Sequence, residues 1–158
     1  MKKAKYETFL PKLKALIEGI DDEVSVLANV SAALHTEFQW FWTGFYLVKG
    51  TQEVQSLHLG PFQGTPACYM IPLGKGVCGT AWQRKETIVV EDVEKFPGHI
   101  ACSSLSQSEI VVPLKDKTGM IRAVLDVDSQ MKSCFDDTDK YYLELAMNIV
   151  ERAIYNKE

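Results

Sequence analysis

The sequence lacks long apolar segments. No run approaches the roughly 18–20 residues that a membrane-spanning helix needs, and the longest candidate, residues 41–48, is interrupted by Thr43 and Gly44. The first residues, MKKAKYETF, place no apolar segment behind their lysines, so they do not resemble a secretory signal. We therefore expect a cytoplasmic protein that does not enter a membrane.

Basic residues are also in short supply. The 158 residues include 17 Lys and Arg against 21 Asp and Glu, which gives a net charge of −4. Binding to nucleic acid requires a basic face that neutralises phosphates, and anionic lipid surfaces attract the same kind of face. The composition therefore argues against nucleic-acid and membrane partners.

The sequence has no internal repeat, low-complexity stretch or linker. Hydrophobic residues make up 46% and charged residues 24%, which is the balance of a globular protein. A chain of this length fits one domain. We expect residues 1–158 to form a single domain with a substantial core.

Hydrophobic periodicity and turn residues predict an α+β protein. Residues 1–36 have helical spacing, with Pro11 near the start of a short first helix, and Gly60-Pro61 is expected to end the second strand. The expected strands are residues 42–48, 54–59, 67–71, 87–90, 108–114 and 120–127, with helices over 80–84 and 137–155. Because hairpins dominate, we expect a mostly antiparallel sheet with the terminal helices on one face.

Cysteine is sparse, and the four cysteines form no CxxC pair. They stand at positions 68, 78, 102 and 134, which excludes a thioredoxin-type motif and argues against a zinc ribbon. His99 and Cys102 have an HxxC spacing that Cys68 and Cys78 would complete. Structural zinc sites usually close through two short local pairs, so we expect no metal site.

A reducing cytoplasm also disfavours standing structural disulfides. Free cysteines are often small buried hydrophobes, and we assign that role to Cys134. Cys78 lies in the segment GKGVCG ahead of an expected helix, where backbone N–H groups and Lys75 would favour a thiolate. Cys102 lies in a polar loop beside His99, where a chemical role is favoured slightly over a structural one.

Acidic residues mark the ends of two expected strands. Asp126 and Asp128 lie on the same face of one strand, roughly 6–7 Å apart. Such a pair can bind an ammonium group or hold a proton for general-acid catalysis, although a solvated strand end is the commoner arrangement. Glu109 opens another apolar strand and is either a partner for a hydrogen-bond donor or the wet end of that strand.

Aromatic residues crowd positions 40–46. Trp42, Phe45 and Tyr46 lie on either side of Gly44, and the alternation of a strand cannot bury all of them on one face. Aromatic clusters usually belong to a core. We nevertheless expect one or two of these rings to line a pocket, where they would add a cation–π attraction for a small cation.

Six short motifs together resemble those of the free methionine-R-sulfoxide reductases, which are single GAF-domain enzymes. They are LGPFQG at 59–64, AC at 67–68, GKGVCGTA at 74–81, PGHIAC at 97–102, SEIVVP at 108–113 and LDVDS at 125–129. The resemblance covers about residues 20–155. It implies a GAF-like fold with a six-stranded, mostly antiparallel sheet and helices packed on its face. It also implies reduction of the R-epimer of free methionine sulfoxide.

The resemblance further implies roles for individual residues. Cys102 matches the catalytic cysteine, and Cys68 or Cys78 would form a disulfide with its sulfenic acid, which thioredoxin or a similar dithiol donor reduces. The implied substrate pocket has aromatic walls and an acidic polar set, namely Trp42, Tyr46, Glu109, Asp126 and Asp128. The order of the two resolving cysteines and the identity of the proton donor stay open. No metal or organic cofactor is implied, and because family members are often dimers, a homodimer is expected.

Two other functions are alternatives. A GAF domain can bind a small molecule and signal without catalysis, but we expect no output domain here, and the cysteines have no role in that function. An acidic pocket also suits a phosphate-bearing ligand poorly. A redox-sensing interaction protein would use the cysteines but would need no acid cluster. Turnover of a small sulfoxide distinguishes the enzyme from both.

Overall fold

The computed structural model describes residues 1–100 and 102–157, so Ala101 of the PGHIAC motif and Glu158 lie outside the described residues. Its helices are α1 (Lys2–Ile17), α2 (Glu23–Phe38), α3 (Gly76–Arg84) and α4 (Asp137–Ile154), with a 3-10 turn at Val93–Lys95. Its strands are β1 (Trp42–Gly50), β2 (Gln55–Gln63), β3 (Met70–Pro72), β4 (Ile88–Val90), β5 (Ser108–Lys115) and β6 (Ile121–Ser129).

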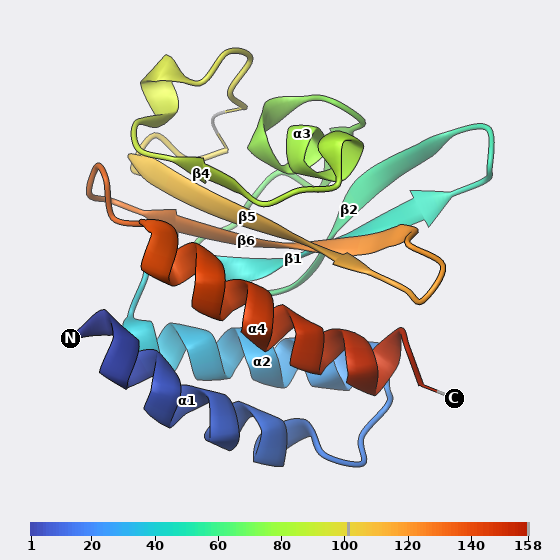
Figure 1. Ribbon diagram of the computed structural model, residues 1–158. Coiled ribbons are helices and arrows are strands. Elements are labelled where there is room, and N and C mark those ends of the chain that lie inside the picture. Colours follow the sequence, from blue (N-terminus) through green and yellow to red (C-terminus); the bar gives the residue numbers. More distant parts are fainter. Residues whose placement is uncertain (101, 158) are drawn as a thin grey trace.

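The strands form one sheet with the order β3-β2-β1-β6-β5-β4, and every neighbouring pair is antiparallel. Helices α1, α2 and α4 cover one face of this sheet, with α1 outermost, whereas α3 and the loop after β4 cover the other face (Figure 1). The expected α+β architecture, with the terminal helices on one face of an antiparallel sheet, is confirmed.

Helix α1 is longer than expected and holds Pro11 in its interior. An interior proline costs about 3 kcal/mol because it removes a hydrogen bond and crowds the preceding turn. Four buried residues at helical spacing anchor α1 in the core, namely Tyr6, Phe9, Leu13 and Ile17. Burial of each such side chain contributes about 1.5–3 kcal/mol, so the packing of the four side chains outweighs the cost of the proline. Pro11 itself lies on the exposed face of the helix.

An acidic capping box fixes the start of α4. The side chain of Asp136 accepts the backbone N–H of Asp139, and the side chain of Asp139 accepts the backbone N–H of Asp136. Asp139 is only 2% exposed, and it also accepts hydrogen bonds from Nζ of Lys2 at 2.6 Å and from the hydroxyl of Tyr6 at 2.7 Å. Because Lys2 and Tyr6 belong to α1, this carboxylate ties the first helix to the last.

Strand β2 continues past Gly60 and Pro61, where the sequence predicted its end. The register with β1 shifts between Gly44 and Tyr46, and Pro61 has no partner residue in that register. A proline at such an irregularity removes no hydrogen bond from the ladder. The shift in register therefore lets the strand run through both residues.

The register of β1, β5 and β6 brings candidate residues together. Glu109 of β5 pairs directly with Asp128 of β6, and Asp128 pairs on its other side with Trp42 of β1. Asp126 pairs with Gly44, two residues farther along the same strands. Since residues two apart on a strand share a face, these side chains all lie on the α3 side of the sheet.

Alternation along β1 and β6 separates two cores. Phe45, Leu125 and Val127 lie in the core that α1, α2 and α4 cover. Trp42 and Tyr46 lie in the second core, together with buried residues of α3. The aromatic cluster is therefore divided between the two faces, as strand geometry requires.

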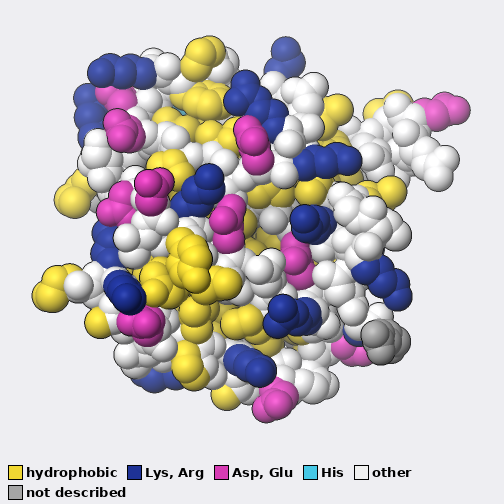
Figure 2. Space-filling model, viewed as in Figure 1, with side chains coloured by type: hydrophobic (Ala, Val, Ile, Leu, Met, Phe, Trp, Pro, Cys, Tyr) yellow, Lys and Arg dark blue, Asp and Glu magenta, His cyan; other side chains and the backbone are white. Residues whose placement is uncertain are grey.

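The surface carries mixed charge. Figure 2 shows Lys and Arg side chains interspersed with Asp and Glu side chains over the face seen in Figure 1. Among the described residues, none of the helices combines the length and apolar character required to span a bilayer.

Candidate active site

A small cavity of about 50 Å³ lies between the sheet, α3 and the loop that precedes β5. Seven of the eight residues singled out from the sequence line it, namely Trp42, Tyr46, Cys78, Cys102, Glu109, Asp126 and Asp128. The eighth, Cys68, is bonded to Cys102. The fold thus gathers at one place residues that lie far apart in the sequence.

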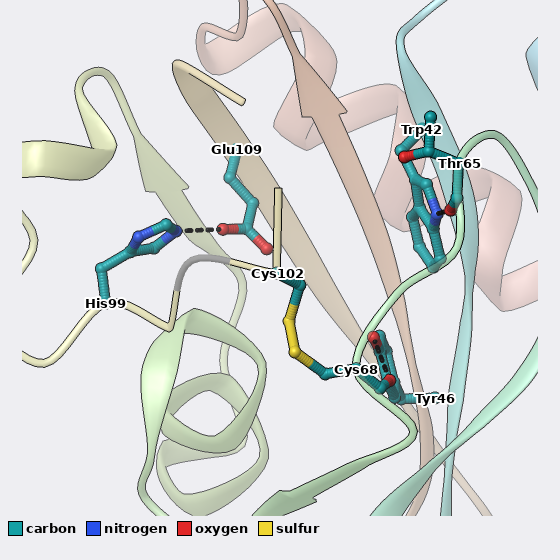
Figure 3. Close-up of a disulfide and its surroundings, with 7 residues drawn as sticks. All are labelled: Trp42, Tyr46, Thr65, Cys68, His99, Cys102 and Glu109. Carbon is teal, nitrogen blue, oxygen red and sulfur yellow. Dashed lines mark hydrogen bonds and ion pairs between the residues drawn. A yellow bond between two sulfur atoms is a disulfide. The ribbon is translucent and has the colours of Figure 1, made fainter. Parts of the chain in front are cut away.

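Cys68 and Cys102 form a disulfide whose Cα atoms are 5.5 Å apart (Figure 3). Cys68 lies between β2 and β3, and Cys102 lies between β4 and β5. This bond is one of the two pairings of Cys102 that the resemblance implied. The sequence disfavoured only disulfides that brace a fold, and this bond joins two loops beside a cavity.

Cys78 lies in the first turn of α3 and is 3% exposed. Burial raises the pKa of its thiol well above the usual value, and the charges of Asp126, Glu109 and Asp128 raise it further. The predicted thiolate on Cys78 is therefore wrong. The prediction considered the backbone N–H groups and Lys75, which are local in sequence, and missed the carboxylates that the sheet places opposite the sulfur.

The three acids lie together, with Glu109 and Asp126 buried and Asp128 half-buried. Glu109 is 5% exposed and Asp126 is 6% exposed, so neither is a solvated strand end. Burial raises the pKa of Glu109 to about 8, and the charge of Asp128 adds to that shift. Burial likewise raises the pKa values of Asp126 and Asp128, which also repel neighbouring carboxylates. Burial therefore favours the protonated form of each acid, and Glu109, with a pKa of about 8, is mainly protonated at neutral pH.

One oxygen of the cluster has no hydrogen-bond partner. Oδ1 of Asp126 is buried and unpaired among the described residues, and Asp126 lines the cavity. A buried acceptor without a donor costs about 1–3 kcal/mol. Such a group is suited to bind a ligand that brings its own N–H groups or charge.

His99 faces the acid cluster from the loop that carries Cys102. Its Nε2 lies 3.6 Å from Oε1 of Glu109 (Figure 3). Burial lowers the pKa of His99, against the opposing charge of Asp126, so the imidazole is mainly neutral at neutral pH. The sequence considered His99 only as a zinc ligand and missed this contact, which depends on how the loop folds over β5.

The aromatic walls are held by hydrogen bonds to the segment that carries Cys68. Nε1 of Trp42 donates to the backbone oxygen of Thr65 at 2.9 Å, and the hydroxyl of Tyr46 donates to the backbone oxygen of Cys68 at 2.9 Å (Figure 3). The two rings are stacked with centroids 6.0 Å apart. The prediction that one or two of the clustered aromatics line a pocket is confirmed.

A third ring and a glycine complete this wall. Phe62 stacks on Trp42 with ring centroids 5.1 Å apart. A Cβ at Gly44 would lie 2.8 Å from both the Trp42 ring and Cα of Phe62, so glycine is required for this close packing. The sequence did not single out Phe62, although its PFQG motif was the signal that could have identified it.

The fold and site match known proteins. A family model described as GAF domain matches residues 22–154. The chain belongs to the GAF-domain family. Within it, the chain is 40% identical to the free methionine-R-sulfoxide reductase of Saccharomyces cerevisiae over 93% of its own length and 86% of that protein. The chain therefore belongs to the free methionine-R-sulfoxide reductases, as the motifs predicted, and the GAF-like fold is confirmed.

Two further relatives span nearly the whole GAF domain. The GAF domain-containing protein A of Dictyostelium discoideum is 52% identical, over 95% of this chain and 92% of that protein. The free methionine-R-sulfoxide reductase of Neisseria meningitidis, solved in complex with its substrate, superposes with a TM-score of 0.92 at 47% identity. That match covers 97% of this chain and 90% of the solved one.

Proposed function

We propose that this GAF domain reduces free L-methionine-R-sulfoxide to methionine, with Cys102 as the nucleophile. The observation that carries the proposal is the Cys68–Cys102 disulfide beside a cavity lined by acids and aromatic rings. A chain of this family with two bonded cysteines at such a cavity has the components of a thiol-based sulfoxide reductase.

In the first step, the Cys102 sulfur attacks the sulfur of the sulfoxide. The sulfoxide oxygen takes up a proton and is transferred to Cys102, which becomes a sulfenic acid as methionine leaves. The substrate sulfur gains two electrons, and the cysteine sulfur loses two. The sulfur–sulfur bond formed by the attack and the substrate sulfur–oxygen bond break as the oxygen moves to Cys102. This transfer requires a proton donor, because the oxygen of the attacked sulfoxide carries negative charge until it is protonated.

In the second step, the Cys68 thiol attacks the sulfenic acid of Cys102, and water leaves as the disulfide forms. Its bond to Cys102 supports Cys68 as the resolving cysteine. The burial of Cys78 and the raised pKa of its thiol argue against Cys78 in that role. A thioredoxin-type dithiol of the cytoplasm then supplies two electrons and two protons, which restores both thiols.

Glu109 is the proposed proton donor. Its pKa of about 8 keeps it protonated at neutral pH, and it reaches the cavity from β5 on the same side as Cys102 (Figure 3). His99, 3.6 Å away, can return a proton to it from solvent. Asp126 and Asp128 are left to bind the ammonium group of the substrate.

The same acids account for selectivity toward the free amino acid. An ammonium group can donate to the unpaired Oδ1 of Asp126, whereas a peptide nitrogen carries no charge and one N–H group at most. A peptide would leave the buried carboxylates without a partner, which costs about 1–3 kcal/mol for each such group. Trp42 and Tyr46 offer the apolar surface for the S-methyl end.

Methionine release tests this proposal. We expect turnover of the R-epimer with dithiothreitol, little turnover of the S-epimer, and none in Cys102→Ser. Cys134→Ser is the matched control, because Cys134 packs against the other core. A folded protein that turns over neither epimer would overturn the proposal and favour a ligand-binding GAF sensor, and turnover of a peptide substrate at the same rate would overturn the selectivity.

A further inference from the structure

Three potential metal ligands meet inside the cavity. Sγ of Cys78, one oxygen of Glu109 and one oxygen of Asp126 all lie within 4.8 Å of one another, and all three residues are buried. They come from α3, β5 and β6, so two layers of the fold hold them in place. None of the three takes part in the disulfide.

The unpaired oxygen of Asp126 is a second, independent indication that a ligand binds here. Asp126 is 6% exposed, and its Oδ1 lacks a hydrogen-bond partner in the described part of the chain. The side chain lines the cavity with Cys78 and Glu109. A cation coordinated by this oxygen would satisfy it without any new hydrogen-bond donor.

We propose that Cys78, Glu109 and Asp126 form a zinc-binding site that competes with the substrate for the cavity. Zinc would displace the protons of the Cys78 thiol and of the two acids on binding, because metal ligands bind in their deprotonated form. The resulting thiolate and carboxylates together suit Zn²⁺, whereas Mg²⁺ and Ca²⁺ take oxygen ligands in larger number. Tetrahedral zinc with sulfur and oxygen ligands places those atoms roughly 3.6 Å apart. The ligand atoms lie within 4.8 Å of one another, so their separations need to close by up to roughly 1.2 Å.

His99 lies beside this group and not within it. Its Nε2 is 3.6 Å from Oε1 of Glu109, but the ligand atoms that all lie within 4.8 Å of one another are those of Cys78, Glu109 and Asp126. A water molecule would therefore be the fourth ligand of a tetrahedral zinc ion here. This zinc site differs from the HxxC arrangement considered from the sequence, because Cys68 and Cys102 are bonded to each other.

The site has a functional consequence that rests on the proposed function. Zinc would occupy the acids assigned to the ammonium group and the proton donor, so it would inhibit competitively with methionine sulfoxide. Its ligands do not include Cys68 or Cys102, so zinc would bind both the reduced and the disulfide form. Inhibitors that act by capturing the catalytic thiol would bind only the reduced form.

Zinc titration of the disulfide form tests the site without any need for turnover. In that form the free thiols are those of Cys78 and Cys134, which offers a matched pair of variants. We expect calorimetry to give one zinc ion per chain, and Cys78→Ser to weaken binding by about tenfold or more. Cys134→Ser should bind zinc as the parent protein does. Glu109→Gln should also weaken binding, while the far-UV circular dichroism spectrum stays unchanged.

Cobalt substitution in the unmodified protein provides a test that does not depend on a variant folding. Cobalt(II) takes the same kinds of ligand as zinc, and in the disulfide form it should give the near-ultraviolet absorption of a cobalt–thiolate bond, which added zinc should abolish by displacing the cobalt. Equal zinc affinity in Cys78→Ser, loss of binding in Cys134→Ser, or cobalt binding without that absorption would overturn the site. Zinc binding without sulfoxide turnover would instead contradict the proposed function and leave the metal site standing.

Discussion

Glu109 and Asp128 pair directly with each other across the ladder between β5 and β6. Two like charges in directly opposed positions destabilise a sheet, and here burial adds to the cost of ionising both. The pair avoids this cost when Glu109, with a pKa of about 8, keeps its proton, so the fold places a protonated carboxyl group in the cavity that Cys102 also lines.

The rate of sulfoxide reduction should fall as the pH rises through about 8. The reason is that Glu109, with a pKa of about 8, loses the proton that the leaving oxygen needs. Glu109→Gln should lower kcat/KM by about 10²–10⁴-fold and remove the descending limb near pH 8. If the decrease in rate near pH 8 persists in Glu109→Gln, another group donates the proton to the sulfoxide oxygen.

Stability should decrease between about pH 4.5 and pH 8. Glu109 has a folded-state pKa of about 8 against an ordinary value of 4.5, so its contribution is fully present below pH 4.5 and is lost as the pH rises through 8. Urea unfolding at pH 5 and pH 8 measures the difference. In Glu109→Gln we expect a smaller difference between the two free energies of unfolding, and the part that remains comes from Asp126 and Asp128. An unchanged difference would show that Glu109 ionises normally.

Removal of Cys68 should separate the chemical step from recycling. With a thioredoxin-type donor, Cys68→Ser should release about one methionine per chain and then stop, because no disulfide forms for the donor to attack. Dithiothreitol should restore multiple turnovers by reducing the sulfenic acid directly. Cys134→Ser should recycle normally with either reductant. With the thioredoxin-type donor, the opposite result would make Cys78 the resolving cysteine: Cys78→Ser would stop after one methionine per chain, and Cys68→Ser would recycle normally.

A methyl group at Gly44 should damage the aromatic wall. In Gly44→Ala, the new Cβ would lie 2.8 Å from Trp42 and from the backbone of Phe62, and overpacking of this kind costs about 1–3 kcal/mol. We expect KM for the sulfoxide to rise about tenfold if that cost appears in binding. Gly119→Ala is the comparison, because its Cβ would meet nothing within 4 Å. It should reduce stability through its φ of +88° and leave KM unchanged. An unchanged KM in Gly44→Ala would show that the wall is adaptable.

The hydrogen bonds of Asp139 that join α1 to α4 should contribute strongly to the stability of the fold. Asp139→Ala removes a buried acceptor of Lys2 and Tyr6 and one half of a capping box, so we expect a loss of about 3–5 kcal/mol in the free energy of unfolding. Asp21→Ala breaks an exposed ion pair with Lys157 and should cost less than about 1 kcal/mol. Chemical denaturation measures both, and equal losses would argue against the buried network.

Most elements could be predicted from the sequence, because strand alternation and turn residues are local signals, whereas the membership of the cavity was implied by the family resemblance of the six motifs. The common face of Asp126 and Asp128 follows from strand alternation. The course of α1 through Pro11 could not be predicted, because tertiary packing of Tyr6 and Phe9 overrides a local penalty. The continuation of β2 through Pro61 depends on a register shift in its partner strand.

The protonation of Cys78 was mispredicted for a related reason. Its sequence neighbours include a lysine and helical N–H groups, and these favour a thiolate. Its spatial neighbours are carboxylates from β5 and β6, and these disfavour one. The contact between His99 and Glu109 likewise joins a loop to a strand, and loop conformation is the part of a fold that local patterns specify least.

The pairing of β6 with β1 and β5 also protects the protein against misassembly. A slip of one residue would turn Asp126 and Asp128 toward the three covering helices and expose Leu125 and Val127 to the cavity. Two carboxylates in an apolar core would be so unfavourable that the slipped sheet would not persist. The residues proposed to bind the substrate therefore also have a role during folding, because they disfavour an incorrectly registered sheet before any ligand is present.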